Sequence, residues 1–370
     1  MSNSARILDF SDGFILHKNV MSDLIRDSEP DLMPLVSIMI PTFRRPDLLR
    51  ESLASALAQK TSIPFEVVVV DNDNDPERSS IVNAVINGFE APNLRLFRNQ
   101  ENIGMFGNWN RCIELARSEW LSILNDDDLL KANFIDTIWR AKQGTAMVAA
   151  NFEHFGQILR SHPAIELFKP LYLYLRDVWR FRKGFHRIIL SDVLRTHPMQ
   201  GSLGVLLNKA VAVRLGGYNE SCWPSADYVF TVRYWIEEDV ILLPDKLAAY
   251  RWQENASLNT KTLEGWLPKN FLVRNELIES LPCNSTRKSL LLYLSRLQAR
   301  SDAFISRTRV NSEFDSVNAL QKIGITNVEH FYLTAISPLM RVLWRVSIMN
   351  LELRKVHDSN VLHIRTKHDQ

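Results

Sequence analysis

The sequence predicts an α/β fold in which helices flank a mainly parallel sheet and a helical C-terminal region follows. Three observations lead to this prediction. Between residues 35 and 150, short runs rich in Val, Ile and Leu alternate with amphipathic segments, the pattern of strands and helices around a parallel sheet. The runs are almost continuously apolar, as expected for strands buried on both faces. Residues 261–370 contain long amphipathic stretches and few strand signals.

Five strands are expected in the first half of the chain. They are LVSIMI at 35–40, FEVVVVD at 65–71, LRLFR at 94–98, WLSIL at 120–124 and AMVAA at 146–150. Each is short enough for a strand and too short for a typical helix.

The segments at 45–59 and 104–118 are expected to be helices that cross over between these strands. The first has Pro46, which suits an opening helical turn, and places Leu49 and Leu53 on one apolar stripe. In the second half of the chain, the glycine pair at 216–217 is expected to end a helix.

The composition indicates a folded globular protein with one large or two modest cores. Of 370 residues, 46% are hydrophobic and 23% are charged. A formal net charge of +2 is too small to predict nucleic-acid binding. The three cysteines are widely spaced and odd in number, which fits neither a disulfide framework nor a zinc site. Without a signal peptide or an uncharged apolar run of membrane length, a cytoplasmic location is expected.

Acidic residues follow two of the expected strands, at the point where each strand ends. Asn125 and the aspartates at 126–128 follow the fourth strand, and Asp71 closes the second, followed by the acid-rich run at 72–75. Neighbouring carboxylates repel one another unless a cation, hydrogen bonds or water relieves them. Open sheets bind ligands at the carboxyl ends of their strands. Oxygen ligands without nearby Cys or His point to Mg²⁺ or Mn²⁺, the usual companions of diphosphates.

An alternative for 126–128 is a turn exposed to water, in which one aspartate caps the helix that follows. The strand ends alone leave this alternative open.

Four sequence blocks carry a resemblance to a known family. They are VSIMIPTFRRPDLLRESLASALAQ, EVVVVDNDND, ENIGMFGNWNRCIELARSEWLSILNDDDLL and LGGYNESCWPSADYVFTVRYW. In this order they resemble the successive blocks of family-2 glycosyltransferases with the GT-A fold, over residues 35 to about 255. The resemblance implies a transferase that uses a nucleotide-sugar donor and inverts the anomeric carbon.

The resemblance also implies a division of the chain. Residues 1–34 would be an N-terminal extension, 35–150 the half that binds the nucleotide sugar, and 151–260 the half that binds the acceptor. The helical region at 261–370 lies outside the resemblance.

For the donor, the resemblance implies nucleotide contacts from one set of residues: Pro41, Thr42, Arg44, Asp71, Asn72 and Asp126. Asn72 stands where family members often have aspartate. An amide oxygen can still accept a hydrogen bond from a pyrimidine base, so a UDP- or dTDP-linked sugar is expected and the base stays open.

For the chemistry, the resemblance implies a metal motif and a general base. Asn125 replaces the first acid of the metal motif, whereas Asp127 and Asp128 keep the later ones, with Asp127 as the direct ligand of Mn²⁺ or Mg²⁺. Asp227 matches the acid that takes the acceptor proton, although its neighbour is Ala226 where the family has a second acid. A helix N-cap is the alternative role for Asp227.

Three further residues are candidates for contacts to the diphosphate or acceptor: Arg233, Arg251 and Trp252. The alternatives are a solvent-exposed salt bridge for Arg233, a surface position for Arg251 and a core position for Trp252.

Two segments raise the question of a membrane. Residues 168–187 interleave aromatic side chains with Arg and Lys, and 328–356 is amphipathic. Such segments suit a membrane interface or a lipid-linked diphosphate, and also suit packing on the protein or a dimer contact.

The sequence therefore predicts a metal-dependent hexosyl- or deoxyhexosyltransferase of bacterial surface polysaccharide synthesis. It would act on a glycan or lipid-linked glycan, in the cytoplasm or peripherally on the inner membrane face. Two alternatives are a non-catalytic nucleotide-sugar-binding protein and a sugar nucleotidyltransferase, although the loop PTFRRPD lacks the glycines expected for the latter.

Overall fold

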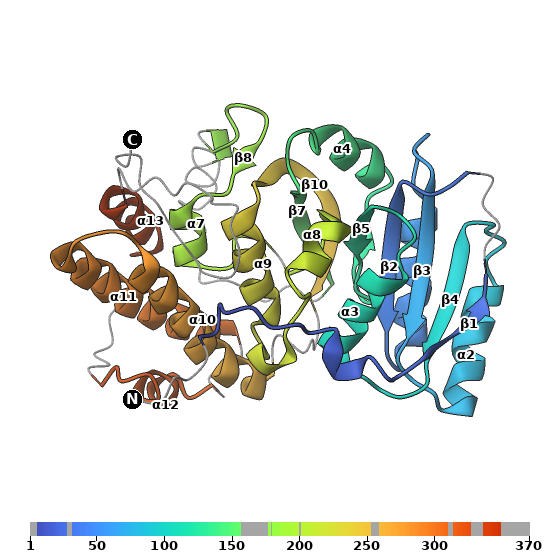
Figure 1. Cartoon of the computed structure of the whole chain (residues 1–370), viewed down its shortest axis with the longest axis horizontal. Helices are drawn as coiled ribbons and strands as arrows, with labels where there is room; N and C mark the ends of the chain where they lie inside the picture. Colours follow the sequence, from blue (N-terminus) through green and yellow to red (C-terminus); the bar gives the residue numbers. More distant parts are fainter. Residues whose placement is uncertain are drawn as a thin grey trace.

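The computed structural model describes residues 6–27, 32–156, 177–178, 180–199, 201–252, 259–309, 314–326 and 336–348. Within these residues, one sheet runs through the first two thirds of the chain, and helices gather at the C-terminal end (Figure 1).

The sheet has the strand order β1-β4-β3-β2-β5-β9-β7-β10-β6, and β8 pairs with β10. Its strands are β1 (Ser22–Arg26), β2 (Val36–Thr42), β3 (Phe65–Asp71), β4 (Leu94–Asn99), β5 (Trp120–Ile123), β6 (Leu129–Leu130), β7 (Met147–Gly156), β8 (His186–Arg187), β9 (Val205–Asn208) and β10 (Val240–Trp252).

The five expected strands are confirmed, and the centre of the sheet is parallel. β4, β3, β2 and β5 run in one direction, with Thr42 level with Asp71 in the β2–β3 register. The acidic ends of these strands therefore meet at one edge, as the sequence predicts. Beyond β5 the sheet is mixed, because β9 lies antiparallel between β5 and β7.

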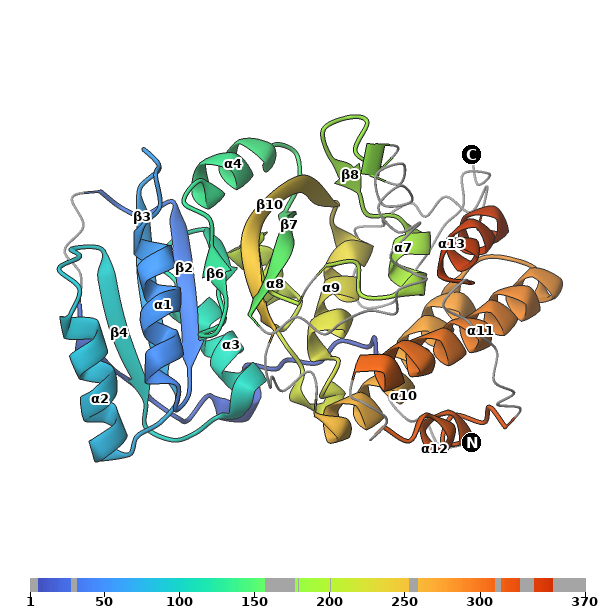
Figure 2. The same cartoon turned by 180° about the vertical axis from the view of Figure 1, so that it is seen from behind.

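Two layers of helices cover the sheet, one on each face. Successive side chains of a strand point to opposite faces, so each strand packs against both layers. Ile38 and Ile40 pack with α1 (Pro46–Leu57), α2 (Pro76–Asn87) and α4 (Phe134–Ala141) on one face (Figure 2). Met39 packs with α3 (Gly104–Leu115), α8 (Lys209–Arg214) and α9 (Ala226–Glu237) on the other. A strand with apolar side chains on both faces needs this double cover.

Two helix ends lie where the sequence predicts them. α1 begins at Pro46, and its Leu49 and Leu53 are fully buried. Gly216 and Gly217 follow α8 with φ of +76° and +64°, a conformation that favours glycine. Side chains there would also collide with the segment before β1, since a Cβ on Gly216 would lie 2.5 Å from the carbonyl oxygen of Ser11.

The N-terminal segment contacts both the C-terminal helices and the far edge of the sheet. Glu276 accepts hydrogen bonds from the backbone N–H groups of Ile7 and Leu8, and β1 then pairs antiparallel with β4 at the far edge of the sheet. The segment crosses the lower front of the molecule in Figure 1.

The C-terminal region is helical, as predicted. Its helices are α10 (Thr260–Ser280), α11 (Ser285–Arg309), α12 (Ser316–Gln321) and α13 (Ile336–Ser347). Met340 and Trp344 of α13 join the core that contains α9 and α7 (Leu190–Arg195).

In the part of the chain that the structure describes, no helix combines the length and apolarity needed to cross a bilayer. Half of the aromatic and basic segment, 168–176 and 179, lies outside the described residues, as do 328–335 and 349–356. The expectation of membrane contact for these segments stays a prediction.

Candidate active site

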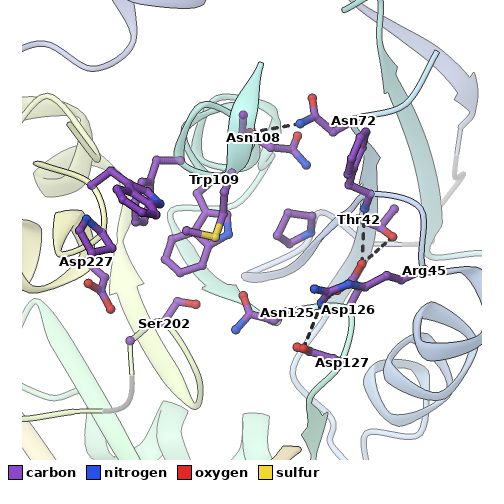
Figure 3. Close-up of a pocket in the computed structure, with 18 of the residues that line it drawn as sticks. Thr42, Arg45, Asn72, Asn108, Trp109, Asn125, Asp126, Asp127, Ser202 and Asp227 are labelled. Atoms are coloured by element: carbon purple, nitrogen blue, oxygen red, sulfur yellow. Dashed lines mark hydrogen bonds and ion pairs between the residues drawn. The ribbon is translucent and has the colours of Figure 1, made fainter. Parts of the chain in front are cut away.

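A cleft of about 560 Å³ opens beyond the carboxyl ends of β2, β3 and β5. Pro41, Thr42 and Asn72 form part of its wall, together with Asp126 and Asp127. Asp227 lies on the opposite side of the cleft from these two aspartates (Figure 3). Residues from three strand ends and from the start of α9 are thus brought to one cavity.

Asp126 joins the end of β5 to the loop after β2. Its Oδ2 accepts a hydrogen bond from Thr42 Oγ1 at 2.9 Å and from the Phe43 N–H at 3.4 Å. Burial raises the pKa of Asp126 to about 6, and the nearby Arg45 opposes part of that rise. A bound cation would favour the ionised form of this carboxyl group.

Asp127 faces the cleft and is paired with an arginine. Its Oδ2 lies 3.0 Å from Arg45 Nη1, and the same nitrogen lies 3.4 Å from Asp126 Oδ1. Arg45 also lines the cleft. The wall therefore carries two carboxylates and one cation side by side.

Asp128 does not line the cleft, whereas the resemblance implies that it holds a metal ion together with Asp127. It is fully buried; its Oδ1 accepts the Arg251 N–H at 3.0 Å and its Oδ2 accepts from Asn125 Nδ2 at 3.1 Å. Burial raises the pKa of Asp128 to about 7, and repulsion from Asp127 adds to the rise. Its role in the fold is to fasten β10 to the end of β5.

The alternative of a solvated capping turn is wrong. The three aspartates are 6%, 9% and 0% exposed. The short strand β6 follows them, and α4 begins only after Asn133, which makes no side-chain cap.

Arg251 and Trp252 do not line the cleft. Arg251 Nε donates to the carbonyl oxygen of Asp127 at 2.8 Å, and its Nη2 donates to Glu51 at 2.6 Å. Trp252 contacts the ring of His154. Arg251 supports the aspartate loop from behind, which explains its position without a ligand.

Arg233 is also directed elsewhere. It is 6% exposed and lies over the ring of Phe10 at 5.5 Å. Burial lowers the pKa of Arg233. Arg233 does not line the cleft, and its contact to a diphosphate or acceptor stays a prediction.

Asn72 lines the cleft, but its side-chain amide is already hydrogen-bonded to neighbouring parts of the protein. Its Nδ2 donates to Asn102 Oδ1 at 2.8 Å and to the Gly104 carbonyl at 3.1 Å. Its Oδ1 accepts from Asn99 Nδ2 at 2.9 Å and from the Ile103 N–H at 3.1 Å. Each of its polar atoms thus makes two hydrogen bonds, and the amide fixes the turn that begins α3.

Asp71 and Arg44 are not among the residues that line the cleft. Asp71 is fully buried against Arg98 at 3.0 Å, and burial raises its pKa. Arg44 has φ of +60°, and its Nε donates to Asp73 at 2.8 Å. The arginine of this loop that lines the cleft is Arg45, which the sequence pattern did not single out because Arg44 and Arg45 are alike in type.

Asp227 sits in the first turn of α9, where the sequence left both catalysis and capping open. The N-cap position is Ser225, whose side chain makes no cap hydrogen bond. Asp227 Oδ1 accepts the Tyr228 N–H at 2.8 Å, and its side chain is 28% exposed. The carboxylate therefore keeps lone pairs that can face the cleft.

The cleft also contains residues that no sequence pattern identified. Trp109, Trp223 and Tyr250 supply aromatic surface, and Ser202 supplies a hydroxyl group. They come from separate blocks of the chain, and only the fold brings them together.

The carboxylate oxygens of the cleft wall suit a hard divalent cation that is also bound by a phosphate group of the ligand. The described residues contain no group of three or more His, Cys, Asp or Glu side chains that could hold an ion unaided. Mg²⁺ is commonly held by one or two carboxylates, and substrate phosphates and water complete its shell. Asp127, with Asp126 beside it, fits that mode.

Known proteins share sequence with this chain. The family model described as glycosyl transferase family 2 matches residues 37–197. An uncharacterised protein of Mycobacterium tuberculosis is 25% identical over 70% of this chain and 81% of its own length. GalNAc(5)-diNAcBac-PP-undecaprenol beta-1,3-glucosyltransferase of Campylobacter jejuni is 30% identical over 32% of this chain and 38% of its own length.

Solved structures share the fold. S. aureus TarS 1-349 in complex with UDP-GlcNAc has a TM-score of 0.51 at 16% identity, covering 86% of this chain and 90% of its own. The mannosyltransferase PcManGT of Pyrobaculum calidifontis, in complex with GDP-Man and Mn²⁺, has a TM-score of 0.50 at 17% identity, covering 89% and 90%. At these identities the likeness concerns the fold alone.

Proposed function

This chain belongs to glycosyltransferase family 2 and has a GT-A-type fold, and on that premise we propose that it transfers a sugar from a nucleoside diphosphate to a hydroxyl acceptor with inversion. The observation that carries the proposal is the placement of Asp127 and Asp227 on opposite walls of one cleft. Inversion needs the leaving group and the general base on opposite faces of the sugar. This arrangement would meet that need if Asp127 holds the ion that binds the departing diphosphate and Asp227 acts as the base.

On the donor side, Asp127 would hold Mg²⁺ or Mn²⁺, with Asp126 close by. A bound divalent ion would stabilise the charge that grows on the departing diphosphate. The fold relative PcManGT was solved with GDP-Man and Mn²⁺, which supports a divalent ion here. Arg45 lies 3.0 Å from Asp127 and is suited to bind the diphosphate, because a guanidinium can bind two phosphate oxygens at once.

On the acceptor side, Asp227 would take the proton of the attacking hydroxyl group. The bond from the anomeric carbon to the phosphate oxygen breaks as the bond to the acceptor oxygen forms, and the proton passes to the carboxylate. A well-placed general base contributes roughly 10²- to 10⁴-fold in rate.

We further propose a UDP- or dTDP-linked hexose or deoxyhexose as donor and a glycan or lipid-linked glycan as acceptor, in the cytoplasm or at the inner membrane face. The Campylobacter relative is named as a glucosyltransferase that acts on an undecaprenol-linked glycan, which supports that class of acceptor.

The test is a donor panel with three variants. Purified protein is incubated with UDP-, dTDP- and GDP-sugars and Mn²⁺, and release of the nucleoside diphosphate is measured with and without sugar acceptors. Wild type should turn over at least one donor, and Asp127→Ala and Asp227→Asn should each lose at least about 100-fold in rate. Asp245→Asn is the matched control, since this exposed aspartate on β10 is not part of the cleft wall.

Each alternative has its own outcome. Cleavage of donors only when pyrophosphate is supplied would mean a sugar nucleotidyltransferase. Binding without turnover would mean a nucleotide-sugar-binding protein, and either result would refute the transferase proposal.

A further inference from the structure

His197 lies directly behind Asp227. It follows α7, and its ring is 12% exposed. The ring does not reach the cleft wall, but its Nε2 lies 3.8 Å from Asp227 Oδ2 and 3.4 Å from Thr231 Oγ1. Since Thr231 is one turn beyond Asp227 on α9, the histidine contacts the same face of this helix twice.

The other ring nitrogen fixes the tautomer of His197. Its Nδ1 accepts a hydrogen bond from the Met199 N–H at 3.2 Å. An imidazole nitrogen that accepts a hydrogen bond carries no proton, so the neutral ring bears its proton on Nε2. Nε2 therefore acts as the donor toward Thr231 Oγ1 at 3.4 Å, and Asp227 Oδ2 lies 3.8 Å from the same nitrogen.

The ring of His197 is also held in place by packing. It lies 5.6 Å from the ring of Tyr228, and Tyr228 is anchored by its hydroxyl group, which donates to the Val193 carbonyl at 2.5 Å. Thr231 is buried. The donor at Nε2 therefore keeps a fixed direction relative to α9.

We propose that His197 is a positioning residue for Asp227, a role that rests on the function proposed above. The Tyr228 N–H donates to Oδ1 at 2.8 Å, and His197 Nε2 lies 3.8 Å from Oδ2, where a small approach would make it a second donor. With donors on both oxygens the plane of the carboxylate would be set, and the remaining lone pairs would be left for the acceptor hydroxyl group. Donor–acceptor distances at such sites commonly shorten when the substrate binds.

Two polar substitutions separate this role from a packing role. Glutamine can place an N–H donor where Nε2 lies, whereas the amide of asparagine reaches only the position of Nδ1. His197→Asn keeps the contact to Met199 and removes the donor to Asp227; His197→Gln keeps that donor. Both variants are uncharged and smaller than or similar to histidine in volume.

The experiment measures kcat, donor KM and UDP affinity for wild type and both variants, using the best donor of the panel with Mn²⁺. His197→Asn should lose about tenfold or more in kcat, since small misplacements of reacting groups have effects of this size. UDP affinity, donor KM and melting temperature should stay close to wild type, and His197→Gln should recover most of the lost turnover.

Three results would overturn the proposal. The first is wild-type kcat in His197→Asn. The second is an equal loss of kcat in both variants, and the third is a loss explained by weaker UDP binding or a lower melting temperature. Turnover by wild type tells the two failures apart. If wild type turns over no donor, the proposed function fails; if wild type turns over a donor and one of these three results is found, only the role of His197 fails.

Discussion

Arg45 Nη1 lies 3.0 Å from Asp127 Oδ2, on the wall of the cleft that faces Asp227. The side chain of Arg45 is 41% exposed, whereas that of Asp127 is 12% exposed. An arginine that is freer than its partner can change partners when a ligand arrives. A donor diphosphate and a divalent ion would do this, because the ion takes the carboxylate and the phosphates take the guanidinium.

This relationship predicts that Arg45 binds the donor and Arg44 does not. Arg45→Gln should weaken UDP binding in the presence of Mn²⁺ about tenfold, equivalent to roughly 1.4 kcal/mol. Arg44→Gln is the adjacent control, and its affinity should stay within about threefold of wild type because its Nε donates to Asp73, outside the cleft wall. Calorimetric titration with UDP measures both. A larger effect in Arg44→Gln would return the donor contact to Arg44.

The buried aspartates predict a pH dependence of stability without metal. Burial raises the pKa of Asp126 to about 6 and that of Asp128 to about 7, above the value near 4 of an unfolded aspartate. Between pH 4 and pH 7 the folded protein therefore binds more protons than the unfolded chain, and these two groups lower the free energy of unfolding as the pH rises.

Asp128→Asn tests the pH dependence, since it removes one of the two titrating groups. With chelator present, urea unfolding between pH 4.5 and pH 7.5 should show a shallower fall in stability for the variant than for wild type. Asp245→Asn, at an exposed site, should leave the slope unchanged. Parallel slopes for Asp128→Asn and wild type would contradict the raised pKa of Asp128.

Asn72→Asp is predicted to destabilise the protein, although it restores the acid that many family members have. The Asn72 Nδ2 group donates to Asn102 Oδ1 and to the Gly104 carbonyl. A carboxylate would face both acceptors without a proton. The expected loss is about 1–3 kcal/mol in the free energy of unfolding, the usual effect of leaving buried polar groups unpaired. Urea unfolding at pH 7.5 measures it, and a stability equal to wild type would show that the amide network can rearrange.

Arg251→Met is predicted to weaken both the fold and the metal site. The guanidinium joins the Asp127 carbonyl on the aspartate loop to Glu51 on α1. Methionine keeps much of the apolar stem and removes these hydrogen bonds, with an expected loss of about 2 kcal/mol. The control is Arg214→Met, whose more exposed pairs with Glu237 and Glu238 should contribute less than about 1 kcal/mol. Stability is read from urea unfolding and Mn²⁺ affinity from titration; an effect no larger than the control's would refute the anchoring role.

Local sequence was enough for the strands, the crossover helices and the acidic strand ends. β2, β3 and β5 are largely apolar runs, whereas β4 also carries Arg95 and Arg98; strands buried on both faces tend to be rich in apolar residues. Parallel strands also bring their carboxyl ends to one edge. The expected strand ends therefore predict that Asp71 and the aspartates at 126–128 meet at one edge of the sheet, whereas Thr42, which shares the cleft with Asp126 and Asp127, was implied by the family resemblance.

The direction of each polar side chain was decided only by the tertiary structure. Asp127 and Asp128 are adjacent and identical in type, yet one faces the cleft and the other is buried, because β10 offers Asp128 the Arg251 N–H. Arg44 and Arg45 differ in the same way, since a positive φ at Arg44 turns the chain between them. Neighbours distant in sequence supply these partners, and a sequence pattern does not record which residue receives them.

His197 shows the same limit most clearly. Nothing in its local sequence marks it, and its relation to Asp227 arises because the segment after α7 packs against the first turn of α9. The sequence by itself determined the class of fold and the chemical types present at the strand ends. Long-range packing determined which of those groups reach the cleft, because hydrogen-bond partners and burial are set by contacts between distant parts of the chain.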